Sequence, residues 1–403
     1  MDLTWIDGGV TAPLGFEAGA VAAGIKTYGP EPRLDVALIR AAEGTTVAGV
    51  FTRNQVVGAP VELCRARVPR GRARAVVVNS GCSNVATGER GRSDARAMAR
   101  LAGEHLGVPE EEVFVASTGV IGRPLPMDRI ESGIRAVRAT REGGEEFSRA
   151  IMTTDTVMKR RAVRITASGR TYTVGGTAKG SGMVHPDMAT VLCFLTTDAP
   201  VPAAWLAATL REVADVSLNM VDVDMDTSTS DTMLVLASGA AGGAPVDADH
   251  PAAPALRAAI EAVAVELARD LARDGEGART LIEARVSGAR TLEDARRAAR
   301  TIVSSPLVKS MVTGRDANLG RLMMAVGRSG AEVDVDRTSV FIGPHCAFER
   351  GAPTETPYAV ISRALDAPEV ELRVDLGLGQ HEARAWGCDL TEEYVKINAH
   401  YTT

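Results

Sequence analysis

At 403 residues, with 45% hydrophobic and 24% charged side chains, the chain has the size and composition of a globular protein of two domains or one large two-lobed unit. A net charge of −6 and only 4% aromatic residues disfavour nucleic acid as a partner. No apolar run approaches the ~20 residues that span a bilayer, and the first seven residues carry acids where a signal peptide carries Lys or Arg. We therefore predict a cytoplasmic protein that does not contact a membrane.

The cysteines and histidines do not suggest a metal site or a disulfide framework. The five cysteines are scattered without a C-x-x-C pair. The six histidines lack ligand spacing such as H-E-x-x-H. We predict that the protein binds no metal.

The first half of the chain predicts alternating strands and helices. Residues 74–79 form a continuous apolar run that ends in Ser80-Gly81, which predicts a buried strand leading into a loop. Ser93 is a candidate helix cap, and Gly107 is a candidate helix stop. The predicted elements are strands at 46–52, 74–79 and 112–117 and helices at 94–106, 127–139 and 143–155.

The second half continues the mixture. Residues 238–251 are rich in Gly, Ala, Pro and Asp and predict an exposed loop, whereas 370–376 alternate apolar and polar residues as a half-buried strand does. The predicted elements are strands at 191–195, 232–237, 279–286 and 370–376, helices at 202–216 and 252–274, two helices between 291 and 327, and mainly strands from about 331. Strands and helices without strict alternation indicate the α/β class in its layered, α+β form.

Thr190 is the strongest candidate for a nucleophile. It follows a Gly-rich turn and precedes the apolar run 191–195, so a strand fixes the hydroxyl while a loop leaves room for substrate. If the peptide between Ala189 and Thr190 is cut, Thr190 gains a free α-amine, whose pKa of about 7.7–8 leaves much of it neutral near pH 7–8. One residue would then be both nucleophile and proton acceptor.

The charge divides unevenly at this point. Residues 1–189 hold 25 Lys and Arg against 20 Asp and Glu, and residues 190–403 hold 20 against 31. The net charges of +5 and −11 would attract two separated chains, although chance explains such a division equally well.

Other polar residues are candidate site residues, each with an ordinary alternative. Thr118 and Gly119 follow a predicted strand and offer two donors for an oxyanion, or form a simple turn. Lys179 precedes Gly180 rather than following a second Gly, which does not support a nucleotide-binding loop. It would bind a substrate carboxylate or lie exposed on the surface.

Three further segments would each either form part of the site or have an ordinary structural role. Thr153 and Thr154 would line a site or cap a helix. Glu276 would pair with a substrate ammonium or be a solvated loop acid. Asn398 and Thr403 lie at the C-terminal end, where chains are usually disordered, but the tail from residue 394 lacks the composition of a frayed end.

Taken together, these pieces resemble the ornithine acetyltransferase family of bifunctional glutamate N-acetyltransferases. The segment 179–190, Lys-Gly-Ser-Gly-Met-Val-His-Pro-Asp-Met-Ala-Thr, resembles the family's self-cleavage motif, and its Met-Ala-Thr junction is highly specific. The match runs through nearly the full length in the right order. The other matching segments are 9–13, 24–26, 117–122, 151–156, 275–278, 305–309 and 397–403.

The resemblance implies an N-terminal-nucleophile fold and a precursor that cuts itself into an α chain, residues 1–189, and a β chain, residues 190–403. It implies an α2β2 assembly and a ping-pong reaction in which Thr190 moves acetyl from N2-acetylornithine to glutamate, releasing ornithine and N-acetylglutamate, without a cofactor. Acetyl-CoA is a further candidate donor. By the resemblance, Thr118 and Gly119 form the oxyanion hole, and the substrate contacts are Thr153, Lys179, Thr190, Glu276, Asn398 and Thr403.

The sequence departs from the family pattern in three places. Residues 316–321 read Asp-Ala-Asn-Leu-Gly-Arg, without the usual Pro and Trp; Met225 replaces a usual Gly; and His185 and Asp187 flank Pro186 where other residues are common. These changes leave the range of acceptors open, and the sequence does not determine the oligomeric state or feedback by arginine. The rival interpretations are an amidohydrolase or aminopeptidase of the same fold, a secondary-metabolism relative with another acceptor, and an uncleaved binding protein.

Overall fold

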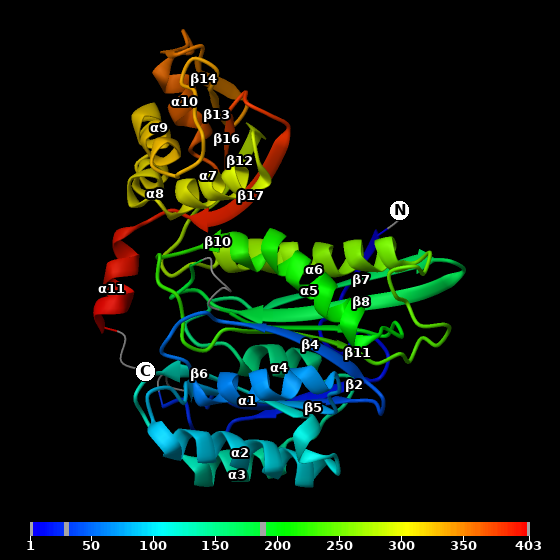
Figure 1. Cartoon of the computed structure of the whole chain (residues 1–403). Helices are drawn as coiled ribbons and strands as arrows, with labels where there is room; N and C mark the ends of the chain where they lie inside the picture. The colour runs from blue at the N-terminus through cyan, green and yellow to red at the C-terminus, as the bar shows by residue number, and fades with distance from the viewer. Residues whose placement is uncertain (1–2, 28–31, 186–190, 401–403) are drawn as a thin grey trace.

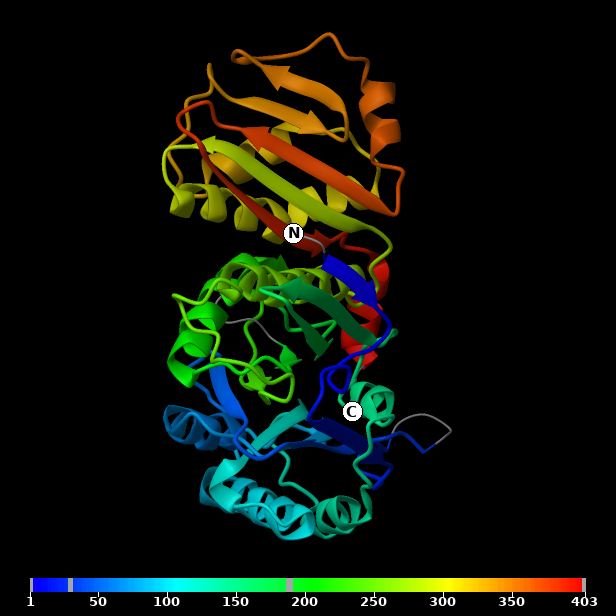
Figure 2. The ribbon, with the colours of Figure 1, turned by 90° about the vertical axis from the view of Figure 1, so that its right-hand side faces the viewer.

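The structure is a computed structural model that describes residues 3–27, 32–185 and 191–400. These residues form three β-sheets with helices around them. Two sheets pack against each other in the lower body of the molecule, and the third lies in an upper lobe (Figures 1 and 2). Within the described residues, no helix has the length and apolarity to cross a membrane.

The larger sheet of the body has six strands in the order β1-β7-β8-β9-β11-β4. Its strands are β1 (Leu3–Ile6), β4 (Thr46–Phe51), β7 (Lys159–Ala167), β8 (Arg170–Lys179), β9 (Leu192–Thr197) and β11 (Thr232–Ala237). Strands β9 and β11 are parallel, and the other pairs are antiparallel. Every residue of β9 is buried, because both faces of this sheet are covered.

The smaller sheet has four strands in the order β2-β3-β5-β6. They are β2 (Phe16–Val21), β3 (Val36–Ala41), β5 (Ala75–Cys82) and β6 (Val113–Val120). Its inner face meets the larger sheet in a shared apolar core, where Phe147 and Phe194 pack edge to face with ring centroids 5.5 Å apart. Strands β5 and β6 are parallel, so their carboxyl ends lie at the same edge.

Helices cover the outer faces of both sheets (Figure 1). Helices α5 (Ala203–Val216) and α6 (Ala253–Arg273) pack on the larger sheet, and α2 (Gly88–Leu106) and α3 (Met127–Ala136) pack on the smaller one. The remaining elements of the body are α1 (Ala59–Arg67), α4 (Gly144–Ala150) and the short 3-10 turns at Val68–Arg70, Glu110–Glu112 and Leu218–Met220. This helix–sheet–sheet–helix layering confirms the predicted layered α+β class.

The upper lobe is built on a seven-stranded sheet in the order β10-β17-β12-β16-β13-β14-β15. Its strands are β10 (Val221–Asp222), β12 (Leu281–Ala289), β13 (Ser339–Ile342), β14 (His345–Glu349), β15 (Ala352–Pro353), β16 (Glu369–Asp375) and β17 (His381–Cys388). Its helices are α7 (Leu292–Ser304), α8 (Pro306–Thr313), α9 (Leu319–Gly327) and α10 (Tyr358–Ala364). The last helix, α11 (Glu392–His400), leaves the lobe and returns along the side of the body (Figure 1).

The predicted strands are present, but several helix boundaries were wrong. Helix α2 ends at the predicted Gly107, which has a left-handed φ of 66°, but it begins at Gly88, so Ser93 lies inside it. The helices predicted at 127–139 and 143–155 end earlier, at Ala136 and Ala150.

The region between residues 291 and 327 holds three helices rather than two. Ser305 ends one helix and caps the next, because its side chain accepts a hydrogen bond from the Val308 N–H and Pro306 follows. Helices α10 and α11 were not predicted, because short helices in a strand-rich region give a weak periodic signal.

Candidate active site

The predicted site residues meet where strand ends of the two body sheets come together. Thr118 and Gly119 lie near the carboxyl end of β6, and Lys179 is the last residue of β8. A cavity of about 160 Å³ opens between them and the end of α11. It is lined by Ser83, Thr118, Gly119, Ile121, Thr153, Thr154, Lys179, Gly182, Met183, Ser228, Thr229, Ser230, Glu276 and Asn398.

Gly119 is a position where only glycine fits. It pairs with Gly81 across β5 and β6, its φ is +125°, and a Cβ there would lie 2.3 Å from the Gly81 carbonyl carbon. The neighbouring Ser117 hydroxyl donates to Asn79 Oδ1 at 2.6 Å. The backbone at Thr118 and Gly119 is therefore held firmly at the cavity wall.

Lys179 links two of the predicted site residues. Its ammonium donates to Thr153 Oγ1 at 2.8 Å and to Thr118 Oγ1 at 3.4 Å. Burial lowers the pKa of Lys179, and the carboxylate of Asp155 opposes this effect. The result is a buried cation on the cavity wall, beside the predicted oxyanion hole.

A buried ion network supports this wall from behind. Lys159 Nζ lies 2.7 Å from Asp155 Oδ1 and 2.5 Å from Asp274 Oδ2, and all three side chains are almost fully buried. Asp155 also accepts from the backbone N–H of Gly180 at 2.7 Å and of Thr153 at 3.0 Å. The network therefore fixes Gly180, which follows Lys179, and Thr153, to which Lys179 donates.

The charges of the network shift the pKa values of its members. Burial alone would raise the pKa of Asp155, but the ammonium groups of Lys159 and Lys179 and the N–H donors hold it well below its ordinary value. Burial would lower the pKa of Lys159, yet Asp155 and Asp274 raise it. Sequence reasoning missed Lys159 and Asp274, and the only available signal was the four-residue spacing between Asp155 and Lys159.

Glu276 forms the acidic side of the cavity. Its backbone N–H donates to the Ser181 carbonyl at 2.7 Å, and its Oε2 accepts from Asn398 Nδ2 at 2.7 Å. Gly182 makes room for this carboxylate, because a Cβ at Gly182 would lie 2.5 Å from it. The Ser181 hydroxyl is 2.6 Å from that of Thr154, which also lines the cavity.

The structure brings six of the eight predicted site residues to one cavity. Thr190, Thr403 and the predicted cleavage residue Ala189 lie outside the described residues. Ser83 and the run 228–230 also line the cavity. The sequence shows 228–230 as a polar run before a strand, but sequence reasoning gave it no role.

Asp231 is a buried acid next to this site. Burial raises its pKa well above the ordinary value, and its Oδ2 atom has no hydrogen-bond partner among the described residues. Together with Val191, it lines a second, small cavity. Its neighbour Thr232 donates its N–H to the Val191 carbonyl at 3.0 Å.

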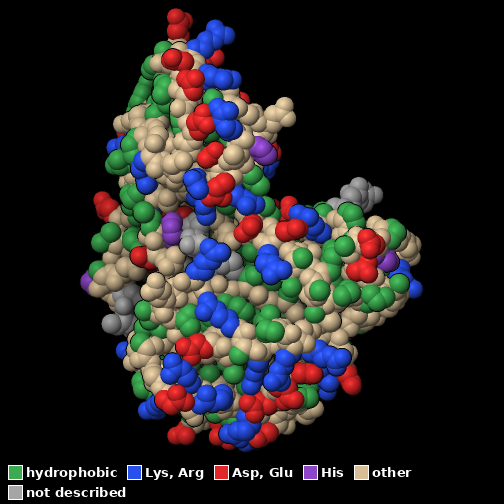
Figure 3. Space-filling model, in the orientation of Figure 1, with side chains coloured by type: hydrophobic (Ala, Val, Ile, Leu, Met, Phe, Trp, Pro, Cys, Tyr) green, Lys and Arg blue, Asp and Glu red, His purple; other side chains and the backbone are tan. Residues whose placement is uncertain are grey.

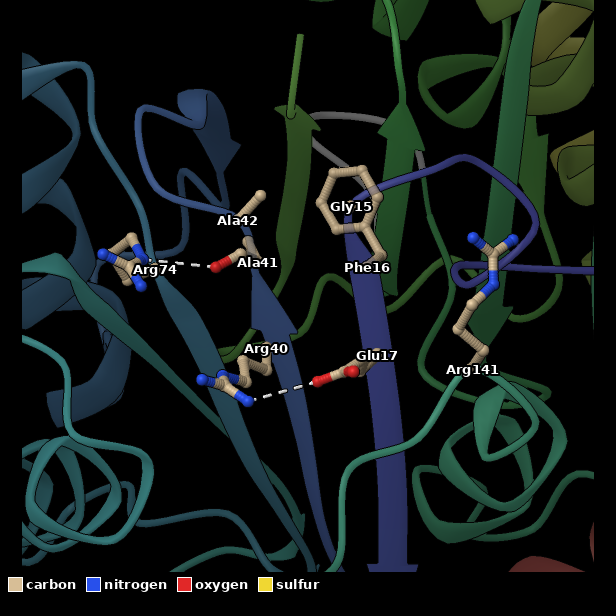
Figure 4. Close-up of a pocket in the computed structure, with 8 residues that line it drawn as sticks. All are labelled: Gly15, Phe16, Glu17, Arg40, Ala41, Ala42, Arg74 and Arg141. Carbon is tan, nitrogen blue, oxygen red and sulfur yellow. Dashed lines mark hydrogen bonds and ion pairs between the residues drawn. The ribbon is translucent and has the colours of Figure 1, made fainter. Parts of the chain in front are cut away.

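A separate cavity of about 270 Å³ lies beside β2 and β3 (Figure 4). Arg40 pairs with Glu17 at 3.4 Å, and Arg74 Nε donates to the Ala41 carbonyl at 3.2 Å. Arg141 lies on the other side of Phe16, so the three guanidinium groups do not converge (Figure 4). This cavity therefore does not offer a built anion site.

Comparison with known proteins identifies the family. The sequence model of the ArgJ family matches residues 17–403. The chain is 51% identical over 403 residues to the arginine biosynthesis bifunctional protein ArgJ of Symbiobacterium thermophilum, with 100% of both chains covered. It is 45% identical over 397 residues to that of Dehalococcoides mccartyi, with 98% of both covered.

A solved structure gives the same result. The crystal structure of the ArgJ protein of Bacillus halodurans is 39% identical and matches with a TM-score of 0.50, covering 51% of this chain and 97% of the solved one. Because sequence matches extend over nearly its whole length, this chain belongs to the ArgJ family, the ornithine acetyltransferase family that its motifs resemble.

Proposed function

We propose that the chain cuts itself between Ala189 and Thr190, and that Thr190 then carries an acetyl group from N2-acetylornithine to glutamate. In the cut, the Thr190 hydroxyl oxygen attacks the Ala189 carbonyl carbon, and the peptide C–N bond breaks to give an ester and a free amine. Water then hydrolyses the ester, which leaves a carboxylate on Ala189 and a free hydroxyl on Thr190.

The transfer uses the same hydroxyl twice. The Thr190 amine accepts the hydroxyl proton while the oxygen attacks the acetyl carbonyl, and the proton passes to the departing ornithine amine. The Thr118 hydroxyl and the Gly119 N–H stabilise the oxyanion of the tetrahedral intermediate. The α-amine of glutamate then attacks the acetyl ester, which yields N-acetylglutamate and restores Thr190.

The charges of the cavity suit both substrates. N2-acetylornithine and glutamate each carry an α-carboxylate, which the ammonium of Lys179 binds beside Thr153. The side-chain ammonium of ornithine pairs with Glu276. Asn398 holds that carboxylate in place, and the tail through Thr403 helps to exclude water, which would otherwise hydrolyse the ester.

The observation that carries this proposal is the meeting of Thr118, Gly119, Lys179, Glu276 and Asn398 at one cavity in a chain of the ArgJ family. The lengths support the cut. About half of this chain, 51%, covers 97% of the solved Bacillus halodurans chain, as expected if family members are divided near their midpoint.

The two halves are built to stay together after a cut. Strands β8 and β9 come from opposite sides of residue 190 and pair along their length in one sheet. The core between the body sheets also draws on both halves. We extend the proposal to an α2β2 assembly in the cytoplasm, which rests on the sequence resemblance.

Intact-mass analysis and N-terminal sequencing test the cut. We expect two species of roughly 20 and 22 kDa by residue share of the 42.3 kDa chain, the second beginning Thr-Val-Leu-Cys. Thr190→Ala should remain one chain and lose all acetyl transfer, because it lacks the nucleophile. A single full-length species with normal activity would rule out the mechanism. Release of acetate instead of N-acetylglutamate would indicate an amidohydrolase.

A further inference from the structure

A larger cavity, of about 640 Å³, lies between the edge strand β4 and the upper lobe. Figure 3 shows Lys and Arg side chains at this level, between the lobe and the layered body. We name this cavity the arginine groove. It is lined by Gly49, Val50, Phe51, Arg53, Arg65, Arg211, Asp215, Asn219, Met220, Glu293, Arg296 and Arg300.

The groove collects positive charge from separate parts of the chain. Its lining contains five arginines and two acids, which leaves a net charge of +3. The arginines come from the segment after β4, from α1, from α5 and from α7. Helical spacing brings only Arg296 and Arg300 together, four residues apart on α7. The other arginines meet them through the fold, and the repulsion among these like charges would be offset by an anion between them.

The two acids neutralise the groove poorly. Asp215 is 3.8 Å from Arg296, and Glu293 is 3.8 Å from Arg300, at the far limit of an ion pair. Glu293 makes its shorter contact, 3.0 Å, with Arg297, which does not line the groove. Arg65 donates to the Thr52 carbonyl, whereas the guanidinium groups of Arg211, Arg296 and Arg300 retain hydrogen-bonding capacity for a ligand.

We propose that the arginine groove binds a phosphate-bearing ligand of nucleotide size. The planar guanidinium fork matches phosphate oxygens in a bidentate manner, and several arginines around one space suit more than one phosphate. The volume falls in the range of small-molecule sites, about 300–1,000 Å³. Val50, Phe51 and Met220 add apolar surface for the part of the ligand that carries no charge.

The groove lies close to the start of β9, which follows the proposed nucleophile by two residues in sequence. Phe51, Thr232 and Leu192 are partners across the neighbouring strands β4, β11 and β9. Two strand spacings, roughly 10 Å, therefore separate the groove from the start of β9. Val50 and Asn219 also line the small cavity that reaches Val191.

Two ligands share this chemistry. One is a nucleotide-linked acyl thioester such as acetyl-CoA, whose long arm would extend toward the start of β9; this source rests on the proposed function. The other is a free nucleotide that regulates the enzyme. Both would use the same phosphate contacts, so binding alone supports the site, and the kinetic comparison below separates the two sources.

Calorimetric titration with 3′-phosphoadenosine 5′-diphosphate tests the site. We expect binding that weakens as salt rises, with no detectable binding of adenosine. The double variant R211Q/R300Q should weaken binding about tenfold or more through the loss of two charge-assisted contacts. The control R257Q/R290Q makes the same charge change at exposed arginines outside the groove and should bind as the unaltered protein does.

Three results would overturn the proposal: no binding of the phosphorylated probe, equal weakening in both double variants, or a change of oligomeric state in R211Q/R300Q without a change in probe binding. The last would make the groove a contact between copies. Thermal unfolding verifies that the variants fold. If the double variant does not fold, R211Q alone replaces it, because Arg211 is exposed on α5.

Kinetics then identify the source of the phosphates. If the ligand is the acyl donor, R211Q/R300Q raises KM for acetyl-CoA about tenfold and leaves transfer from acetylornithine unchanged. If the ligand is a regulatory nucleotide, R211Q/R300Q weakens binding of the nucleotide. The KM values for acetyl-CoA and for acetylornithine, measured without the nucleotide, then stay unchanged. If the protein transfers acetyl from neither donor, the proposed function is wrong, but the titration still tests the groove because it measures binding of the probe and not acetyl transfer.

Discussion

The side-chain amide of Asn398 donates to the carboxylate of Glu276 at 2.7 Å, across 122 residues of sequence. Helix α11 carries Asn398 from the upper lobe to the cavity, yet none of its residues is buried. Other anchors near its start are the Thr391 hydroxyl, which donates to the Gly277 carbonyl at 2.7 Å, and Tyr394, which donates to Asp224. The acidic side of the cavity therefore depends on a helix that contributes little to the core.

Asn398→Ala should weaken substrate binding more than it affects the fold. The lost contact holds a carboxylate, so we expect KM for acetylornithine to rise roughly 3- to 10-fold. The melting temperature should change little, because the helix buries no side chain. Val395→Ala, on the same helix and 64% exposed, is the control. Equal KM values in the two variants would contradict the proposed role of Asn398.

Glu276→Gln tests the acidic contact itself. It retains the size of the side chain and an oxygen that accepts from Asn398, but it removes the charge that we propose pairs with the substrate ammonium. We expect KM for acetylornithine to rise by roughly 10- to 150-fold, which corresponds to about 1.5–3 kcal/mol for a charge-assisted contact. An unchanged KM would remove Glu276 from the substrate contacts.

Gly182→Ala should disturb the same carboxylate from the opposite side. The added Cβ would lie 2.5 Å from the Glu276 carboxylate, which is the mobile end of a side chain and can move away. We therefore expect a loss of acetyl transfer with a change of less than about 1 kcal/mol in the free energy of unfolding. Gly327→Ala, where a Cβ meets nothing within 4 Å, is the matched control. Full activity in Gly182→Ala would show that the position of Glu276 is not critical.

Lys159→Met should lower the free energy of unfolding more than a substitution at the surface does. It leaves Asp155 and Asp274 buried without their shared cation, so we expect a loss of about 3–5 kcal/mol in denaturant titrations. Arg160→Met, which breaks only partly exposed contacts with Asp7 and Glu145, should cost at most about 1 kcal/mol. A loss of similar size in both variants would argue against a buried network.

The same network makes the stability of the fold depend on pH in the acidic range. Because the folded pKa of Asp155 lies well below its ordinary value, its contribution to stability is present above about pH 4, the ordinary pKa, and is lost as the pH falls through the folded pKa. Lys159→Met should lose less stability than the unaltered protein over this fall, since its ion pairs are already absent. Parallel pH profiles for the two proteins would contradict this assignment.

Asp231→Asn should change the dependence on pH in the opposite sense. Burial raises the folded pKa of Asp231, so stability falls as the pH rises from about 4, the ordinary pKa, toward the folded value. Asn resembles the protonated acid and does not ionise, so the variant should be at least as stable at pH 8 and should lack this decline. Measurements of the free energy of unfolding at pH 5 and pH 8, for the variant and the unaltered protein, test this prediction. If the variant is less stable than the unaltered protein by the same amount at both pH values, the carboxyl is needed in its charged form.

The sequence by itself determined where the strands and most helices lie, and it predicted the candidate site residues. The apolar run at 191–195 predicts a buried strand because such residues lose water contact on either face of a covered sheet, and Gly107 predicts a helix end because glycine adopts the left-handed conformation readily. The identities of Thr118, Lys179 and Glu276 came from motifs that resemble a family. Those motifs are short and contiguous, so they can be recognised from the sequence without knowledge of the fold.

Only the tertiary structure decided which distant groups meet. The pairing of Lys159 with Asp274, the return of α11 to Glu276, and the arrival of Arg65 and Arg300 at one groove all join residues far apart in sequence. Such contacts arise from how the sheets and helices pack. No periodic pattern in the sequence predicts them, because their energy depends on burial and charge in the folded chain rather than on local propensity.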